Sequence, residues 1–255
     1  MNGYTQIFND AESIFYTKQN SLDDKEYLFK TFRSQRDIYS FIDNGDTPPD
    51  SEAIQYSIQL NPEMYTYYLN QLEGRKKLGY TSETQFDSYN HLDSRHILMS
   101  IVLYSNIKND ELKSIVEIGG GYGNFLYLNR NREFQNWKII DIPHLLLLQN
   151  YMLKELNVNC PYELISAYDY SEKDFSELDL VIGTHSLSEF SIDIFKNYFY
   201  KVIINSKYLL YVYHISLPSK QLIDSKKEII EEYFSLLFSI TTENNSVITA
   251  LYKKK

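Results

Sequence analysis

The sequence predicts an α/β protein with a seven-stranded, mostly parallel sheet, preceded by a helical N-terminal extension. Three observations predict it. After about residue 112, β-rich runs alternate with segments of helical periodicity, which is typical of a parallel sheet covered by helices. The last two β-rich runs, 234–241 and 246–252, are separated by a short polar connection, which indicates an antiparallel hairpin. Four of the nine glycines fall between Gly119 and Gly123, directly after the first run.

Two domains are expected. Residues 1–110 are predicted to form a helical cap or extension, and residues 111–255 the domain that contains the sheet. Apolar residues recur at helical spacing over 22–36 and again over about 88–105, where Ser105 is also expected on the buried side. Between these segments, Asn61-Pro62-Glu63 has the residue types of a helix start: a capping side chain, a proline in the first turn and an acid near the positive end.

Five β-rich runs precede the hairpin, and each parallel pair of strands needs a helical crossover between its members. The runs are 114–118, 137–141, 162–165, 178–183 and 208–214. The connecting helices are expected from about residue 122, over 143–156, around 194–202 and over 219–232.

Composition bounds the class of protein. Lysine and arginine total 25 against 34 acidic residues, a net charge of −9, so the chain has no overall attraction for nucleic acid or anionic lipid. Cys160 is the one cysteine, which excludes an intrachain disulfide and disfavours a cysteine zinc cluster. The start has no secretory signal pattern, and apolar runs such as 145–148 are far shorter than the ~20 residues that span a bilayer. We expect a soluble cytoplasmic protein without nucleic-acid or membrane partners.

Tyrosine is abundant, with 24 residues. An AT-rich genome would explain it, and aromatic platforms for a flat or sugar-like ligand are the alternative.

The glycine cluster follows Glu117 at the predicted carboxyl end of the first strand, which is where open α/β sheets bind ligands. Glycines let the backbone turn sharply and approach a ligand closely. Asn124 and Phe125 follow the cluster, so the spacing departs from the G-x-G-x-x-G dinucleotide fingerprint. Glu117 is placed to accept a hydrogen bond from a ligand ammonium group or to hold the amides of the loop. A tight turn without a ligand is the alternative. The cofactor-binding candidates here are Glu117, Gly119, Gly120, Gly121 and Gly123.

Asp141 ends the second predicted strand. An acid in this position can accept hydrogen bonds from both hydroxyls of a ribose. The alternative is that Asp141 caps the helix that Pro143 opens.

The fourth predicted strand runs into a polar segment that ends at Glu189. A hydroxyl is a poor nucleophile until its proton is removed, and histidine is the favoured general base near neutral pH. We therefore predict His185 as the base and Glu189 as its orienter or as a ligand of a substrate hydroxyl. A satisfied polar histidine and an acid at a helix start are the alternatives. No histidine has metal-ligand spacing and no metal site is predicted, although carboxylate or amide oxygens leave a divalent cation open.

Three motifs together resemble the class I S-adenosylmethionine-dependent methyltransferases over roughly residues 112–255. They are Ile115–Gly123, Ile139–Pro143 with its Asp-Ile-Pro, and Gly183–Glu189. More narrowly, they resemble the sugar O-methyltransferases of bacterial surface-polysaccharide clusters.

The resemblance implies a Rossmann-like methyltransferase sheet, S-adenosylmethionine as cofactor, and methyl transfer to a hydroxyl of a sugar, sugar nucleotide or glycan precursor in polysaccharide biosynthesis. The resemblance also implies that the glycine loop passes the methionine part of the cofactor, that Asp141 binds the ribose, and that Asp169 lies near the adenine. Two other readings stay open: a degenerate methyltransferase fold that acts as a scaffold, and a nicotinamide-dependent oxidoreductase, which the glycine spacing and the hairpin disfavour. The N-terminal helices would form a substrate lid or an interface, and a homodimer is left open.

Overall fold

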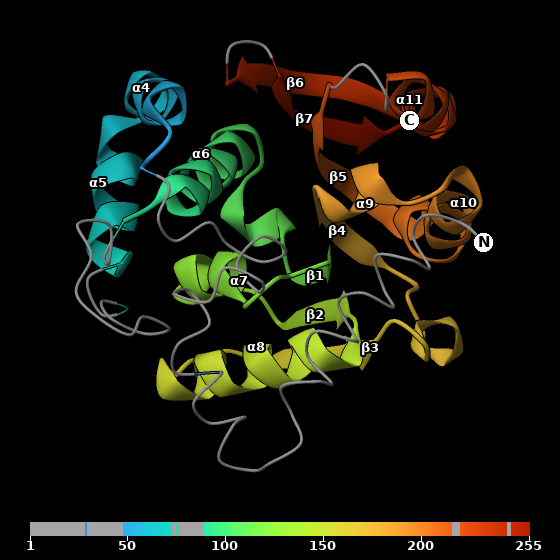
Figure 1. Cartoon of the computed structure of the whole chain (residues 1–255), viewed down its shortest axis with the longest axis horizontal. Helices are drawn as coiled ribbons and strands as arrows, with labels where there is room; N and C mark the ends of the chain where they lie inside the picture. Colours follow the sequence, from blue (N-terminus) through green and yellow to red (C-terminus); the bar gives the residue numbers. More distant parts are fainter. Residues whose placement is uncertain (1–28, 30–47, 73–74, 76–88, 216–219, 244–245) are drawn as a thin grey trace. The chain divides into compact units, whose positions relative to one another are not determined.

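The computed structural model describes residue 29 and residues 48–72, 75, 89–215, 220–243 and 246–255 (Figure 1). The chain separates into two compact units. The first, here called the helical unit, comprises residues 1–101, 121–130 and 143–159; the second, the sheet unit, comprises 102–120, 131–142 and 160–255. The predicted division near residue 110 stays a prediction. The predicted helix over 22–36 lies outside the described residues, apart from Phe29.

All seven strands belong to the sheet unit and form one sheet in the order β3-β2-β1-β4-β5-β7-β6. Neighbours from β3 to β5 pair in parallel, whereas β7 pairs antiparallel with both β5 and β6. The predicted sheet with its terminal antiparallel hairpin is therefore confirmed. The strands are β1 Ser114–Ile118, β2 Asn136–Asp141, β3 Tyr162–Ser166, β4 Leu178–Thr184, β5 Ser206–His214, β6 Phe234–Thr242 and β7 Val247–Lys254.

The central strands of the sheet are apolar because both of their faces are buried. Every residue of β4 except the last, Thr184, is buried, as expected for a parallel strand covered on both faces. In the register, Ile118 of β1 lies opposite both Ile140 of β2 and Gly183 of β4. The three strands therefore end at the same level, and the loops that follow them start side by side.

The helices of the sheet unit follow β4 and β5 in the chain. They are α9 Ser186–Glu189, α10 Ile192–Lys201 and α11 Lys220–Tyr233, with 3-10 turns at η3 Asn109–Glu111, η4 Tyr170–Glu172 and η5 Ile203–Asn205. Helix α9 contacts β4 and β5, α10 contacts α11, and α11 contacts β6 (Figure 1). Helix α10 begins where the hydroxyl of Ser191 accepts a hydrogen bond from the amide of Ile194 and buries Phe195 and Phe199.

The helical unit contains α4 Ser51–Leu60, α5 Pro62–Leu72, most of α6 His91–Asn106, α7 Asn124–Asn129 and α8 Pro143–Glu155. Asn61 caps α5, since its Oδ1 accepts from the amide of Met64 at 2.9 Å, so the predicted helix start is confirmed. Helix α6 buries the expected apolar residues, but Ser105, which the periodicity placed on the buried side, is exposed. Ser105 lies in the last turn of the helix, which ends at Asn106.

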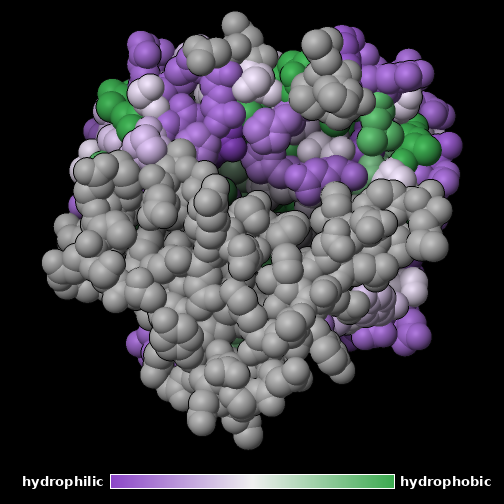
Figure 2. Space-filling model, viewed as in Figure 1, coloured by the Kyte–Doolittle hydropathy of each residue, from purple (hydrophilic) through white to green (hydrophobic). Residues whose placement is uncertain are grey.

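No helix among the described residues has the length and apolar composition needed to cross a membrane. Where described residues are visible in Figure 2, hydrophilic side chains predominate, and hydrophobic ones occur in small separate groups.

Candidate active site

The carboxyl edge of the sheet brings the main predicted site residues into one row. Asp141 ends β2, Gly119 follows β1, His185 follows β4 and His214 ends β5, and these strands are neighbours in that order. The pairing continues one residue past two strands: the amide of Gly119 donates to Ile140 O at 2.9 Å, and that of His185 donates to Val212 O at 3.0 Å. Segments far apart in the sequence therefore meet at one edge, which is where α/β sheets bind ligands.

The first half of the glycine loop packs against the segment after β4. Gly119 has a φ of +77°, and a Cβ at this position would overlap with the side chain of Ser186. The hydroxyl of Ser186 donates to Ile118 O at 2.5 Å. Glycine is therefore required at 119 by both conformation and space. The contact of Ser186 with the loop could not be predicted from local sequence, because the pairing of β1 with β4 creates it.

The second half of the loop belongs to the helical unit. Gly121 and Gly123 also have positive φ, and Gln149 Nε2 donates to Gly121 O at 2.9 Å. Gly123 is the N-cap of α7, and a Cβ there would lie 3.2 Å from Leu153. Helix α7 therefore starts at Asn124, two residues later than the start predicted near Tyr122, because the left-handed glycine precedes it.

A buried polar network holds the residues that flank Gly123. Arg75 Nη1 donates to Tyr122 Oη and to Asn124 Oδ1, both at 2.6 Å, and the guanidinium forms an ion pair with Asp93. Asn124 Nδ2 lies 3.0 Å from Asp93 Oδ1 and 2.9 Å from His96 Nδ1. Burial lowers the pKa of His96 to about 3, so the imidazole is neutral and its Nδ1 accepts. The network fixes the end of the loop, and sequence spacing contained no signal for Arg75.

Glu117 lies inside the sheet unit rather than on its surface. The side chain is 1% exposed, and Trp137 Nε1 donates to its Oε2 at 3.1 Å. Burial raises the pKa of Glu117 to about 8; the indole hydrogen bond opposes this rise and the nearby Asp141 adds to it. The contact found is thus with the core, and the predicted contact with a ligand ammonium stays a prediction.

Asp141 ends β2, and Asp169 follows the neighbouring strand β3; the two acids differ in exposure. Asp141 is 7% exposed, and its Oδ1 accepts from the amide of Ile142 at 2.8 Å. Asp169 is exposed, precedes η4 and donates its amide to Ser166 O at 2.9 Å. The ribose and adenine roles of these two acids stay predictions.

His185 occupies a strained position between β4 and α9. Its φ of +57° is unusual for a residue with a side chain, and such strain is often found at functional sites. The ring stacks on His214, with 4.5 Å between the centroids and 26° between the planes. Helix α9 begins at Ser186, so Glu189 contacts His185 through the backbone, its amide donating to His185 O at 3.1 Å. The predicted orienting role of Glu189 stays a prediction.

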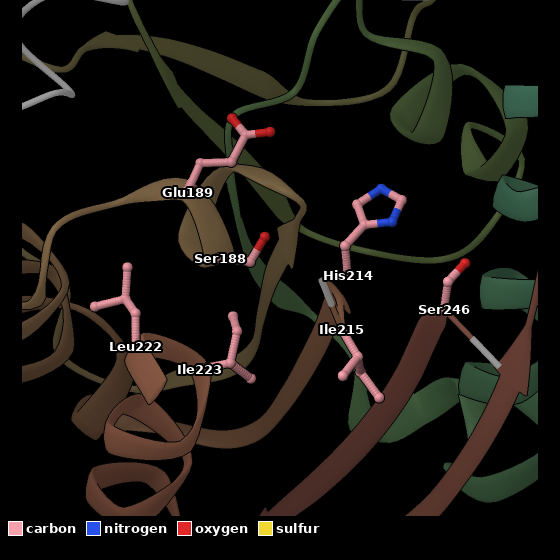
Figure 3. A pocket seen from close by; sticks show the side chains of 7 residues that line it. All are labelled: Ser188, Glu189, His214, Ile215, Leu222, Ile223 and Ser246. Atoms are coloured by element: carbon pink, nitrogen blue, oxygen red, sulfur yellow. The ribbon is translucent and has the colours of Figure 1, made fainter. Parts of the chain in front are cut away.

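A cavity of about 360 Å³ opens beside this histidine pair. Figure 3 shows the side chains of Ser188, Glu189, His214 and Ser246 along one side of it, and those of Ile215, Leu222 and Ile223 along the other. Glu189 and His214 line the cavity, and the ring of His185 stacks on that of His214. The sequence pattern indicated Glu189, whereas the residues from α11 and from the β6–β7 hairpin reach the cavity only through the fold.

Lys226 of α11 holds the short helix that carries Glu189. Its side chain is fully buried and donates to Leu187 O at 3.0 Å and to Ser188 O at 2.7 Å. Burial lowers the pKa of Lys226 to about 8, and the charge of Glu189 opposes this shift. The helical spacing of Ile223, Lys226 and Ile230 places the lysine on the buried face, and this was a signal that the sequence contained.

No family model matches the chain, and no curated protein matches it. Solved structures do. The PH0226 protein of Pyrococcus horikoshii OT3 is 13% identical with a TM-score of 0.53, covering 68% of this chain and 94% of its own. The N-methyltransferase NodS of Bradyrhizobium japonicum WM9, solved with S-adenosyl-L-homocysteine, is 12% identical with a TM-score of 0.52, covering 75% and 98%. PH1948 of Pyrococcus horikoshii, whose assignment as an RNA methyltransferase is provisional, is 16% identical with a TM-score of 0.51, covering 75% and 96%.

At these identities the similarity concerns the fold alone. The strand order, the antiparallel hairpin and the neighbours agree: the chain has the Rossmann-like fold of class I methyltransferases.

Proposed function

We propose that the protein is an S-adenosylmethionine-dependent O-methyltransferase that acts on a hydroxyl of a sugar or glycan precursor. One observation carries the proposal: the row of strand ends at the carboxyl edge of the sheet. Asp141 and the Gly119 turn lie at the ends of β2 and β1, and the stacked pair of His185 and His214 lies at the ends of β4 and β5 beside the cavity. In this proposal the ends of β2 and β1 form the cofactor half of the site, and the ends of β4 and β5 with the cavity form the acceptor half. The two halves are neighbours, as methyl transfer requires.

The residues on the cofactor half fit S-adenosylmethionine. Asp141 offers carboxylate oxygens for ribose hydroxyls at the end of β2, and the left-handed Gly119 lets the backbone pass a ligand without a side chain in the way. Asp169 follows β3, and its proposed role is to lie near the adenine. When bound, this cofactor supplies an activated methyl group. The same fold in NodS, which was solved with S-adenosyl-L-homocysteine, supports the choice.

The chemistry left to the protein is to align the acceptor and to remove one proton. In the proposed mechanism His185 takes the proton from the acceptor hydroxyl, and Glu189 accepts a hydrogen bond from a second hydroxyl. His214 lines the cavity and holds the His185 ring by stacking. Alignment of the reacting atoms supplies much of the rate acceleration.

A sugar acceptor is supported by the resemblance of the motifs and by the polar side of the cavity, where four side chains can bind hydroxyls. The proposal includes a cytoplasmic location, a role in surface-polysaccharide precursor synthesis, and a homodimer as a candidate assembly.

The first test is calorimetric titration with S-adenosylmethionine and S-adenosylhomocysteine, with NADH as the control. We expect saturable binding of the first two alone, followed by methyl transfer to members of a sugar panel, assayed with and without magnesium. Binding of NADH alone would favour the oxidoreductase reading. A folded protein that binds neither methyl cofactor would favour the scaffold reading.

The role of each residue is tested with three variants. Asp141→Ala should weaken cofactor binding far more than His185→Ala, whereas His185→Ala should mainly lower turnover, by about 10²–10⁴-fold as for loss of a general base. Equal loss of cofactor affinity in both would refute the assignment. If His214→Gln abolishes turnover and His185→Ala does not, the base is His214.

A further inference from the structure

We infer that the cavity beside the histidine pair selects an uncharged polyhydroxyl acceptor, and that Glu189 determines this selectivity. The inference rests on the proposed function and deepens it. It separates two acceptor classes that the sequence leaves open: a neutral saccharide, and a sugar that carries a phosphate, diphosphate or carboxylate at the methylation site.

The charge of the lining carries the first step. Among the described residues, the cavity is lined by two serines, one histidine, three aliphatic side chains and Glu189, with no lysine or arginine. For phosphate or carboxylate groups, proteins use arginine or lysine side chains. The described lining has neither and contains the carboxylate of Glu189.

Two lysines of α11, in the part of the chain that the structure describes, already have partners. Lys226 is fully buried, and its ammonium donates to two carbonyls of α9, Leu187 O and Ser188 O. Lys220, at the start of α11, forms an exposed ion pair with Asp224 at 2.7 Å. Using Lys226 for an anionic ligand would leave both α9 carbonyls without this donor, so the structure opposes that use.

The same lysine holds the helix turn that carries Glu189. By holding the carbonyls of Leu187 and Ser188, Lys226 fixes the turn of α9 that ends at Glu189. Glu189 is exposed, and its side chain belongs to the lining of the cavity (Figure 3). A carboxylate accepts hydrogen bonds from neighbouring hydroxyls, which favours a polyol. It repels a phosphate or carboxylate placed beside it.

The aliphatic side of the cavity fits the same acceptor. Ile215, Leu222 and Ile223 face the polar side chains across the cavity (Figure 3). A neutral sugar has C–H surfaces as well as hydroxyls and can contact both sides. A diphosphate would lose hydration against the aliphatic side without gaining a cation.

The test compares matched acceptors in wild-type protein and in Glu189→Gln. Each pair contains a methyl glycoside and the corresponding uronic acid, or a free sugar and its nucleotide derivative. Wild-type kcat/KM should favour the neutral member. Glu189→Gln keeps the size of the side chain and one acceptor oxygen but removes the charge. The ratio of kcat/KM for the neutral acceptor to kcat/KM for the anionic one should therefore fall by roughly tenfold. The matched control is Glu228→Gln, an exposed position of α11 outside the cavity lining, which should leave the ratio unchanged.

Binding is measured in parallel by calorimetry with the same acceptor pairs, so that the inference is tested without turnover. Preferential binding of neutral members that narrows in Glu189→Gln supports the inference even if no methyl transfer is seen, and absence of transfer then counts against the proposed function alone. Wild-type preference for the anionic members, or an unchanged ratio in Glu189→Gln, would overturn the inference.

Discussion

Replacing Glu117 with glutamine should make the stability of the protein less sensitive to pH. Burial of the carboxyl raises its pKa from the ordinary value of 4.5 to about 8, and the hydrogen bond from Trp137 Nε1 at 3.1 Å only partly opposes this. A carboxyl with a higher pKa in the folded state binds its proton more tightly there. Its contribution to the free energy of unfolding is therefore complete below about pH 4.5 and is lost as pH rises through about 8.

The magnitude follows from the displacement of the pKa. At about 1.36 kcal/mol per pH unit, the full loss is at most about 5 kcal/mol, and about 3 kcal/mol of it falls between roughly pH 5.5 and 7.5. Glutamine has the size of a protonated glutamic acid, can still accept from Trp137 and does not ionise. We therefore expect the difference in unfolding free energy, variant minus wild type, to grow by about 3 kcal/mol over that interval.

The assay is urea unfolding at several pH values from about 5.5 to 7.5, with Glu228→Gln as a control for loss of one exposed carboxyl. The slope of unfolding free energy against pH is compared between the variant and the wild type, which removes the contributions of other titrating groups, including the buried His96. A variant whose stability follows the same pH dependence as wild type would refute the reasoning, because it would mean that Glu117 is ionised in the folded protein.

Two further predictions concern the glycine loop. Arg75→Met removes the ion-pair partner of the buried Asp93 and the donor to Tyr122 and Asn124, so it should destabilise the fold by about 3–5 kcal/mol in urea unfolding. The control is Lys173→Met, which breaks the exposed pair with Glu163 and should leave the midpoint unchanged; equal effects of the two variants would contradict the assignment. Gly119→Ala combines a φ of +77° with overlap on Ser186 and should cost about 1–3 kcal/mol and weaken binding of S-adenosylhomocysteine in calorimetry. Gly120→Ala, at a position without positive φ, should have the smaller effect, and the reverse order would count against the steric argument.

Local sequence signals predicted the elements well where one residue pattern determined them. The alternation of β runs and helices, the short Thr242–Asn245 connection and the capping Asn61 were each confirmed by a strand, a hairpin or a helix start. These features depend on backbone propensity and on contacts between residues close in the chain. The start of α7 was misplaced because a left-handed Gly123 ends the loop, and periodicity carries no information about φ.

The site was predictable only in its separate parts. Gly119, Asp141, His185 and Glu189 were identified from their positions after predicted strands, and the strand order then placed the loops that carry the first three along one edge. Contacts between distant segments were not predictable: Ser186 against Gly119, His214 against His185, and Arg75 with Tyr122 and Asn124.

By itself, the sequence determined the type of each element and the chemistry available at the strand ends, because both depend on residue type and local spacing. The tertiary structure alone decided which of these residues meet, where the cavity opens, and that Lys226 and Glu117 are buried. Burial, and with it the pKa of each group, depends on which surfaces the folded chain brings together.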